Sequence, residues 1–444
     1  MGEIIIVGAG VAGLAAADAL TQRGVAVTVL EARERAGGRV QTINSQPANL
    51  VIELGAEFVH GAKNALWPCL RDARLETTDV VDRHWVFSGG GLTEDKSFWH
   101  KIEQVISKIP SRGRDQDLCS FLQRRAWLSP SAMTMLLEYV EGFHAADPHR
   151  VSIRSLAQAE TASEQDEGTK LFRMKRGYGA LVDWFQARAS QKGAEFKFST
   201  IIDRIEWAHG EVVVHAATQK GRAAFRGQLA LVTLPLGVLQ AQGEEGVRFE
   251  PALGQKQKAI NGLAMGEVVK IVMQFRSRFW PVEHMGFIHA PGRRFATWWS
   301  DQRPTGSLLT GWSGGKRASV MAHLSPNEIE VEAIHSLATM FQMDNRRLKE
   351  MLVASYLHDW NGDRFSRGAY SYTPKGMIRA GKELSKPVQE TLFFAGEATD
   401  TEGEQGTVHA ALTSGRAAAK AILRVLKRKS SHSRSSPQLD QRAA

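Results

Sequence analysis

Three glycines near the start of the chain have the spacing of a nucleotide-binding turn. Gly8, Gly10 and Gly13 form a G-x-G-x-x-G pattern, in which the missing side chains let the backbone approach a diphosphate at the amino end of a helix. Glu31 follows 18 positions after Gly13, where a carboxylate can accept hydrogen bonds from the hydroxyl groups of an adenosine ribose. Together these residues predict a dinucleotide site.

The residues that follow Glu31 favour FAD over NAD as the dinucleotide. The segment ARERAGGRV places Gly37, Gly38 and Arg39 just beyond the expected ribose position. Two glycines would let a second stretch of backbone reach the flavin side of a diphosphate, and Arg39 would donate hydrogen bonds to phosphate or to neighbouring groups. The alternative is a surface turn with a solvated arginine.

These residues must be held by a strand, a helix and a second strand. Residues 3–7 (EIIIV) are a short apolar run that ends at Gly8, and residues 11–23 have the small side chains of a tightly packed helix. A second apolar run covers residues 25–30. This order predicts the opening of a parallel dinucleotide-binding sheet.

Other segments predict the rest of the architecture. The sheet is expected to resume at residues 196–235, in runs such as EVVVHA and LALVTLP, and to gain a last buried strand at residues 392–395. Residues 98–160 read as helical, and residues 263–375 mix strands such as VVKIVMQF and FATWWS with helix. One domain is thus expected to be interrupted twice by another.

Two helices carry clear start signals. Ser129 and Pro130 suit the N-cap and the first position of a helix. Ser325, Pro326 and Glu328 have the spacing of a capping box, in which the serine and the glutamate satisfy each other's backbone N–H groups.

The composition is that of a globular protein. The 444 residues are 43% hydrophobic and 23% charged, and the formal net charge is +9. Part of that surplus lies where Lys427, Arg428 and Lys429 lead into a Ser-rich segment, so residues 429–444 are expected to be a disordered basic tail. No aromatic interleaving or reader motif accompanies the tail, and we expect no nucleic-acid partner.

The two cysteines and the N-terminus indicate a compartment. Cys69 and Cys119 imply no disulfide framework and fit a reducing environment. The strand that begins at Glu3 leaves no room for a secretory signal, and no apolar run approaches the roughly 18 residues of a membrane span. We therefore expect a cytoplasmic protein without a membrane anchor.

The chain resembles the flavin-containing amine oxidase family over nearly its whole length. The blocks that carry the resemblance are GAGVAGLAAA, EARERAGGRV, ELGAEFVHG, LVTLPLGVL, GEVVKIVMQF, DWNGDRFSRGAYSY and FAGEATDTEGEQGTVHAALTSG. The resemblance implies an α/β fold in which a Rossmann-like FAD-binding domain is interleaved with a mixed α+β substrate-binding domain. The expected FAD-binding domain comprises residues 1–80, 172–262 and 376–428, and the substrate-binding domain comprises residues 81–171 and 263–375.

The resemblance also assigns residues to the cofactor. Glu397 is expected at the ribityl or diphosphate region, Thr407 and Val408 at the pyrimidine edge of the flavin, and the backbone of Ile202 at the adenine. A helix expected at residues 406–424 would direct its positive amino end at the flavin, although the same segment could be an ordinary packing helix. The residues expected to contact FAD are Gly8, Gly10, Ala12, Gly13, Glu31, Ala32, Arg33, Gly37, Gly38, Arg39, Gly55, Ala56, Glu57, Ile202, Trp360, Gly396, Glu397, Thr407 and Val408.

The resemblance implies three catalytic residues. Lys270 matches the family's flavin-facing lysine, which holds a water against N5, and a lysine in so apolar a strand costs free energy unless it is paired or solvated. The alternative is that the strand exposes Lys270 to solvent. Tyr370 matches an aromatic that flanks the amine, and His60 matches a histidine near the substrate nitrogen in several polyamine oxidases. His60 could also be a loop residue that only makes hydrogen bonds.

The substrate face departs from monoamine oxidases. Thr407 stands where those enzymes carry a second tyrosine. This arrangement looks more like that of polyamine oxidases and lysine-specific histone demethylases. Ala369 stands where monoamine oxidases supply a cysteine, so FAD is expected to be noncovalent. Trp312 is expected to be a pocket wall, and the expected substrate-binding residues are Trp312, Tyr370 and Thr407. No metal cluster is expected.

The implied activity is oxidation of polyamines or related secondary amines. The resemblance implies hydride transfer from the carbon beside the nitrogen to flavin N5, hydrolysis of the imine to an aldehyde and an amine, and reoxidation by O2 with release of H2O2. The alternatives are a primary monoamine or L-amino acid oxidase, a flavin-binding protein without amine turnover, and a desaturase that shares the N-terminal fingerprint. The polar block at residues 359–372 argues against the desaturase.

Overall fold

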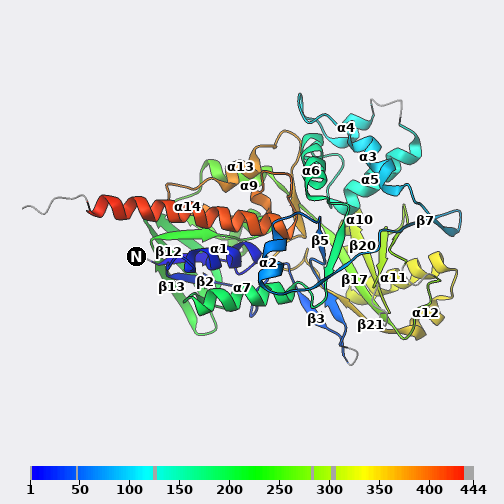
Figure 1. Ribbon diagram of the computed structural model, residues 1–444, viewed down its shortest axis with the longest axis horizontal. Coiled ribbons are helices and arrows are strands. Elements are labelled where there is room, and N and C mark those ends of the chain that lie inside the picture. The colour runs from blue at the N-terminus through cyan, green and yellow to red at the C-terminus, as the bar shows by residue number, and fades with distance from the viewer. Residues whose placement is uncertain (1–2, 47–48, 124–127, 282–284, 302–306, 435–444) are drawn as a thin grey trace, which may run out of the picture.

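The computed structural model describes residues 3–46, 49–123, 128–281, 285–301 and 307–434 (Figure 1). In Figure 1 the helix α14 (Val408–Arg434) lies at one end of the molecule, and the largest sheet lies at the other. The short helices of residues 98–166 lie above that sheet in the same view.

A five-stranded parallel sheet carries the dinucleotide fingerprint. The strand order is β10-β2-β1-β14-β23, and every neighbouring pair is parallel. The expected strand–helix–strand opening and the last strand near residue 392 are both confirmed, and the fold class is α/β. The strands are β1 (Ile4–Val7), β2 (Val27–Leu30), β10 (Glu195–Lys197), β14 (Leu229–Val232) and β23 (Leu392–Phe394).

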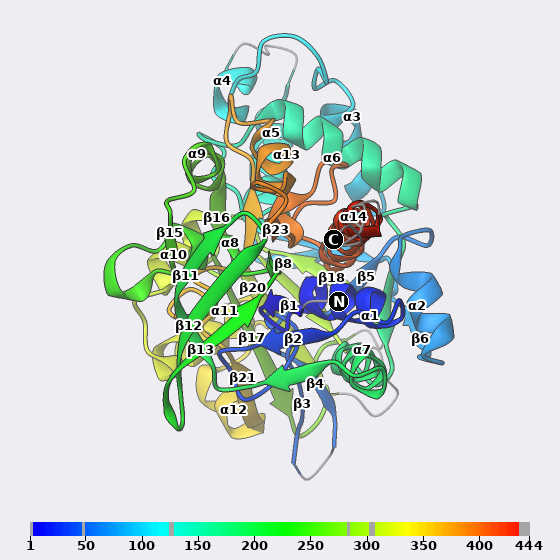
Figure 2. The same cartoon turned by 90° about the vertical axis from the view of Figure 1, so that its left-hand side faces the viewer.

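Each face of this sheet is buried against a different layer. Because side chains alternate along a strand, Ile4 and Ile6 of β1 pack in one core, while Ile5 and Val7 pack in another. The first core is closed by three helices, and the second by antiparallel strands and short helices, as Figure 2 shows on opposite sides of β1. The three helices are α1 (Val11–Thr21), α7 (Gly179–Gln191) and α14.

The expectation that residues 196–235 simply resume the parallel sheet was wrong in part. β10 and β14 join that sheet, but β11 and β12 form a hairpin in a separate sheet of order β13-β12-β11-β15. The physical reason is burial, since β14 is buried throughout whereas β11 alternates between buried and half-exposed positions, as in a sheet with one solvated face. The strands are β11 (Ile201–Ala208), β12 (Glu211–Thr218), β13 (Gly221–Gly227) and β15 (Arg248–Glu250).

A seven-stranded sheet forms the other end of the molecule. Its order is β21-β17-β20-β19-β18-β7-β8, and helices α10 (Lys316–Met321), α11 (Pro326–Phe341) and α12 (Asn345–Met351) pack on it around one core. The capping box at the start of α11 is confirmed. The strands are β7 (His84–Ser88), β8 (Gly91–Glu94), β17 (Val268–Phe275), β18 (Phe287–His289), β19 (Thr297–Ser300), β20 (Leu308–Gly314) and β21 (Leu352–Leu357).

In its described part, the segment expected to be helical forms four helices with a core of their own. They are α3 (Phe98–Ile106), α4 (Leu118–Leu122), α5 (Pro130–Phe143) and α6 (Ile153–Asp166). The predicted start of α5 is confirmed, because the Ser129 hydroxyl accepts the N–H of Ala132 and Pro130 is the first helical residue.

Shorter elements complete the fold. The remaining strands are β3 (Thr42–Asn44), β4 (Val51–Glu53), β5 (Phe58–His60), β6 (Thr77–Asp79), β9 (Leu171–Met174), β16 (Ala264–Gly266) and β22 (Tyr370–Tyr372). The remaining helices are α2 (Leu66–Asp72), α8 (Leu236–Gln240), α9 (Gln255–Gly262) and α13 (Ala380–Ser385), with 3-10 turns at Gly243–Glu245 and Glu397–Thr399. The residue boundaries of the two expected domains stay a prediction.

The expected disorder from residue 429 was wrong for its first residues. Helix α14 continues to Arg434, and the rest of the predicted tail lies outside the described residues. The ion pair of Arg428 with Glu390 at 2.8 Å holds the helix just before the predicted tail begins.

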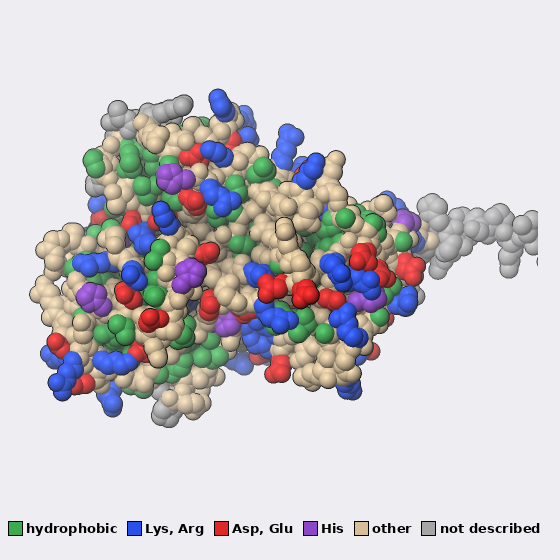
Figure 3. All heavy atoms as spheres, turned by 180° about the vertical axis from the view of Figure 1, so that it is seen from behind, with side chains coloured by type: hydrophobic (Ala, Val, Ile, Leu, Met, Phe, Trp, Pro, Cys, Tyr) green, Lys and Arg blue, Asp and Glu red, His purple; other side chains and the backbone are tan. Residues whose placement is uncertain are grey.

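The charged surface is mixed on the face opposite to that of Figure 1. Figure 3 shows basic and acidic side chains interspersed there over the described residues. No helix in the described ranges combines the length and the apolar composition needed to cross a lipid bilayer.

Candidate active site

One long cavity joins the nucleotide fingerprint to the seven-stranded sheet. Its volume is about 1280 Å³. It is lined at one end by Gly8, Gly10 and Glu31, and at the other by Lys270 and Tyr370. Every residue predicted to contact cofactor or substrate lines this cavity except Gly13.

Two glycines of the glycine-rich turn have different roles: one allows close packing of α1, and the other leaves space for a ligand. A Cβ atom on Gly13 would lie 2.0 Å from the carbonyl oxygen of Gly8, so Gly13 serves close packing of α1 on β1. A Cβ on Gly10 would meet nothing within 4 Å. Gly10 is also the N-cap of α1 and supplies no side-chain cap, so the first N–H groups of the helix face the cavity beside Val11 and Ala12.

Glu31 is held firmly at the end of β2. Its carboxylate accepts the backbone N–H of Ala9 at 2.8 Å and that of Arg33 at 2.9 Å. Burial raises the pKa of Glu31, and these hydrogen bonds and the charge of Arg33 oppose that increase. Each carboxylate oxygen keeps a further lone pair, so the group can still accept hydrogen bonds from a ribose.

Arg33 and Arg39, the two arginines predicted to contact FAD, are already engaged with the protein. Arg33 pairs with Asp363 at 2.8 Å and donates to the Ser366 hydroxyl at 2.9 Å. Arg39 donates through Nη1 to Glu397 at 2.9 Å and to the carbonyl of Ala369 at 2.7 Å. Its other guanidinium N–H groups have no hydrogen-bond partner among the described residues, and Arg39 lines the cavity.

Glu397 connects three segments around the cavity. Besides Arg39, its carboxylate accepts the Ser371 hydroxyl at 2.6 Å and the backbone N–H of Gly406 at 3.0 Å. These contacts tie β22 to the loop before α14. The side chain therefore positions the cavity walls, in addition to any contact with a cofactor.

Lys270 points inward from the centre of β17. It is 4% exposed, and its ammonium pairs with Glu57 at 2.8 Å and donates to the Gly55 carbonyl at 3.0 Å. Glu57 also accepts from Arg173 at 2.8 Å and from the Trp299 indole at 2.9 Å. The solvent-exposed alternative for Lys270 is thus excluded.

The partners of Glu57 determine its charge. Burial alone would raise the pKa of Glu57, but the charges of Lys270 and Arg173 outweigh burial and lower that pKa to about 2. The carboxylate is therefore ionised at neutral pH. Its oxygens face Lys270, Arg173 and Trp299, so the Glu57 side chain acts as a positioning residue for Lys270.

The aromatic end of the cavity is anchored on α5. The Trp312 indole donates to the carbonyl of Gly142, and the Tyr370 hydroxyl donates to that of Phe143, each at 2.7 Å. Burial and the charge of Glu397 raise the pKa of Tyr370, so the phenol stays protonated. His60 packs edge-on against Phe143, and burial lowers the pKa of His60 to about 4, which leaves the imidazole neutral at pH 7.

Thr407 has a structural role that the sequence did not suggest. Its hydroxyl donates to the Glu404 carbonyl at 2.7 Å and accepts the N–H of Ala410 at 3.1 Å, so it caps the first turn of α14. Trp360 lies beneath Gly55 and donates to the Leu54 carbonyl at 2.9 Å.

The other residues predicted to contact FAD also line the cavity. Gly37 and Gly396 have positive φ angles of 105° and 139°, which favour glycine, and Ile202 faces the cavity from β11. Residues that also line it are Ala12, Ala32, Gly38, Gly55, Ala56 and Val408.

The residues present fit FAD. The open position above Gly10, the amino end of α1 and the carboxylate of Glu31 suit a diphosphate and a ribose. The far end supplies the amino end of the long helix α14 and the buried ammonium of Lys270, which suit a ring that gains negative charge on reduction.

Sequence reasoning missed several residues of this cavity. Arg173 and Trp299 hold Glu57, although Arg173 stands 116 positions from it. Asp166, Glu404 and His409 also line the cavity. Glu404 and His409 lie inside the block that carries the family resemblance, but nothing in the sequence brings Asp166 to them.

Comparisons with known proteins agree with this geometry. A sequence model of the family described as flavin containing amine oxidoreductase matches residues 11–108 and 107–423. Lysine-specific histone demethylase 2 of Homo sapiens is 27% identical over 94% of this chain, which spans about half (53%) of that protein. Polyamine oxidase 4 of Oryza sativa subsp. japonica is 27% identical over 94% of this chain and 88% of its own length.

A solved structure shares the fold. Wild-type putrescine oxidase bound to putrescine superposes with a TM-score of 0.80 at 20% sequence identity, and the match covers 95% of this chain and 99% of that one. The family match covers most of the chain, so the chain belongs to the flavin containing amine oxidoreductase family. It is an FAD-dependent enzyme of the amine oxidase class.

Proposed function

We propose that this enzyme oxidises polyamines or related secondary amines. In the overall reaction, a secondary amine, O2 and water give an aldehyde, a smaller amine and H2O2. The observation that carries the proposal is the single cavity, which leads from the nucleotide turn at Gly10 to an aromatic chamber that holds Lys270, Tyr370 and His60.

The turn and the two helix ends would hold the cofactor. The N–H groups that open α1 would bind the diphosphate, Glu31 would bind the adenosine ribose, and the amino end of α14 would lie at the flavin ring. When bound, FAD supplies the acceptor for the hydride lost from the carbon beside the amine nitrogen.

The aromatic chamber would exclude water and orient the amine. Phe58, Phe143 and Trp312 contribute apolar surface to the wall, and the fixed Tyr370 ring provides a flat face for the substrate nitrogen. Neutral His60 can accept a hydrogen bond from an amine N–H. A neutral amine is needed for oxidation, and an uncharged histidine does not oppose binding of the cationic form before it loses its proton.

Lys270 is proposed to hold a water that would lie against flavin N5. An ammonium group has three N–H donors, and two of them are directed to Glu57 and to the Gly55 carbonyl. The third remains for a water in the cavity. The ion pair with Glu57 keeps the side chain in one orientation, which is what a water-positioning role requires.

The cellular compartment and the domain boundaries are also proposals. Cys69 and Cys119 are free thiols, which supports a reducing compartment such as the cytoplasm. The proposed domains are residues 1–80, 172–262 and 376–428 for FAD, and 81–171 and 263–375 for the substrate.

Anaerobic mixing of the purified holoenzyme with a panel of amines tests the function. The absorbance of oxidised flavin near ~450 nm is the readout, and the panel contains spermine, spermidine, putrescine, tyramine and leucine. We expect rapid bleaching by spermidine or spermine, with H2O2 formed once air is admitted. Bleaching by tyramine or leucine alone would indicate a monoamine or amino acid oxidase, and an unchanged spectrum with every amine would contradict the proposal.

A further inference from the structure

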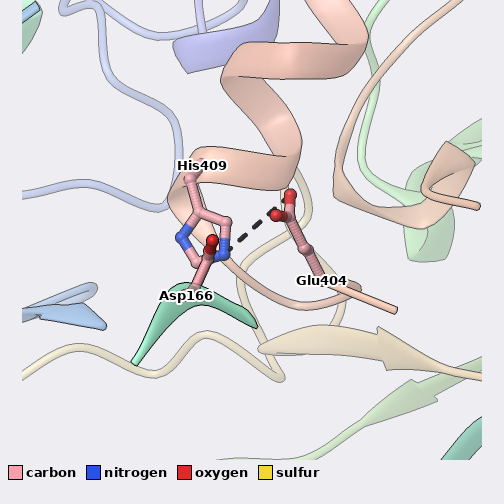
Figure 4. A group of neighbouring side chains, drawn as sticks. All are labelled: Asp166, Glu404 and His409. Carbon is pink, nitrogen blue, oxygen red and sulfur yellow. Dashed lines mark ion pairs between the residues drawn. The ribbon is translucent and has the colours of Figure 1, made fainter. Parts of the chain in front are cut away.

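Three polar side chains meet in the cavity away from Lys270. Asp166 ends helix α6, Glu404 lies in the loop before α14, and His409 is the second residue of α14. Figure 4 shows the three side chains turned toward one another, and their ligand atoms all lie within 4.8 Å of each other. Together they form what we call the Asp166 cluster.

None of the three side chains has a hydrogen-bond partner among the described residues. The shortest contact is between His409 Nε2 and Glu404 Oε2 at 4.0 Å, which is too long for a hydrogen bond. His409 is 5% exposed, and in the described part of the chain neither of its ring nitrogens has a hydrogen-bond partner. Buried polar groups are nearly always satisfied, so an unpartnered buried imidazole that points into an acidic cluster indicates a missing ligand.

No lysine or arginine of the described residues forms an ion pair with Asp166 or Glu404. Lys63, whose backbone N–H contacts the Asp166 carbonyl, directs its ammonium to Glu167 at 2.7 Å. Burial raises the pKa of Asp166, and burial together with Asp400 and Asp166 raises the pKa of Glu404 to about 7. Both groups would gain from a positive charge placed between them.

The cluster borders the proposed amine site. All three residues line the same cavity as Tyr370. The loop that carries Glu404 continues to Gly406, where a Cβ atom would lie 3.0 Å from the Tyr370 ring. A substrate held against Tyr370 can therefore extend along this loop to the cluster.

We propose that Asp166, Glu404 and His409 bind a terminal ammonium group of the polyamine substrate. This assignment rests on the function proposed above. An alkylammonium has three N–H donors, and the cluster offers three acceptors, two carboxylates and one neutral imidazole. The two carboxylates supply the opposite charge, and the imidazole supplies an acceptor without adding charge, because burial and then His60 lower the pKa of His409 to about 3.

The test compares two amines that differ only in their terminal groups. Spermidine and N-propylbutylamine share one secondary-amine skeleton, but only spermidine has terminal ammonium groups. In the Glu404→Gln holoenzyme we expect the KM for spermidine to rise roughly 10- to 100-fold, because a charge-assisted hydrogen bond is lost. The KM for N-propylbutylamine should stay within about twofold of the wild-type value.

Two further variants make the comparison specific. Glu402→Gln removes one charge from the same loop, but Glu402 is exposed and does not line the cavity, so its KM values should match those of the wild type. Asp166→Asn should reproduce the loss seen with Glu404→Gln. The ratio of flavin to protein absorbance reports whether each variant retains FAD. If Glu404→Gln does not retain FAD, Asp166→Asn tests the site independently.

Results that contradict the ammonium site can be distinguished from results that contradict the proposed function. Equal changes in the KM of both amines would overturn the ammonium site and leave amine oxidation standing. A stoichiometric divalent metal in the purified enzyme, lost in Glu404→Gln, would show that the cluster is a metal centre and would also overturn the site. If the wild-type flavin is bleached by no amine, both the site and the proposed function are contradicted.

Discussion

The buried ammonium of Lys270 is stabilised by one carboxylate, that of Glu57. Lys270 and Glu57 are both largely buried, with side chains 3% and 11% exposed, and Glu57 also compensates Arg173. Such a network is costly to break, because the remaining partners keep their desolvation penalty without the attraction that offsets it. The ion pair therefore serves orientation first, and its removal should be seen in stability as well as in turnover.

Glu57→Gln is expected to lower the free energy of unfolding at pH 7 by about 3 kcal/mol. The amide keeps the shape of the side chain but leaves Lys270 and Arg173 without their anion. The pKa of Glu57 is about 2 in the folded protein, against an ordinary value of 4.5, so its stabilising effect is complete above about pH 4.5 and is lost toward pH 2. The difference between wild type and variant should thus shrink in denaturant unfolding at low pH.

An exposed pair provides the control for that measurement. Glu76 pairs with Lys175 at 2.5 Å, but its side chain is 73% exposed, so Glu76→Gln should leave the unfolding curve unchanged at pH 7. If Glu57→Gln behaved like Glu76→Gln, the buried pair would not stabilise the fold. The idea that it locks Lys270 in place would then fail.

At the scale of elements, the glycine-rich turn makes two separable contributions. Gly13 lets α1 approach β1, and Gly10 leaves open the space in front of the first turn of α1. The G-x-G-x-x-G pattern predicted both the site and its elements, because all of its determinants lie within one short segment.

Paired alanine variants separate the two contributions. Gly13→Ala would place a methyl group 2.0 Å from the Gly8 carbonyl oxygen, so we expect severe destabilisation or insoluble protein. Gly10 has a φ of −70° and open space at its Cβ position, so Gly10→Ala should fold normally. We expect its FAD affinity to fall about tenfold or more, since the methyl group occupies the path of the diphosphate.

Two measurements decide between the outcomes. Thermal unfolding of the apoprotein reports the folding of each variant, and quenching of flavin fluorescence reports the dissociation constant of FAD. Wild-type FAD affinity in Gly10→Ala would mean that the diphosphate does not pass over this turn. A stable, soluble Gly13→Ala apoprotein would mean that α1 can move away from β1 without cost.

Elements whose signals are local were predictable, and elements whose partners are remote were not. The caps of α5 and α11 and the opening of the parallel sheet follow from neighbouring residues. The assignment of β11 and β12 to their own sheet depends on which strand faces are buried, which an apolar run alone does not report. The end of α14 was also missed, because a basic, Ser-rich composition suggested disorder.

At the scale of the whole molecule, the candidate site exists only through assembly of distant segments. Lys270 was predicted from the family resemblance and supported by its place in an apolar strand, but its partner Glu57 was assigned to the cofactor and Arg173 was not considered. The Asp166 cluster likewise joins the end of α6 to the start of α14. No spacing rule links such residues, because their proximity is set by how the layers pack.

The same assembly predicts that FAD binding and folding are coupled across the molecule. The cavity of about 1280 Å³ is lined by residues of both the five-stranded and the seven-stranded sheet regions, so FAD would contact both and the apoprotein would lose those contacts. At a free FAD concentration about 100 times its dissociation constant, the holoenzyme should be more stable by about 2.7 kcal/mol. The measurement is thermal unfolding of the apoprotein with and without added FAD.

ADP provides the matched control, because it contains only the adenosine diphosphate part of the cofactor. At equal free concentration ADP should raise the unfolding temperature less than FAD, since it can fill the end near Glu31 but cannot reach Lys270 and should therefore bind more weakly. Limited proteolysis should show the same order, with FAD protecting the segments around α5 and β17 and ADP leaving them sensitive. Equal protection by both ligands would mean that the flavin end of the cavity does not couple the two sheet regions, and that the nucleotide end alone accounts for stabilisation.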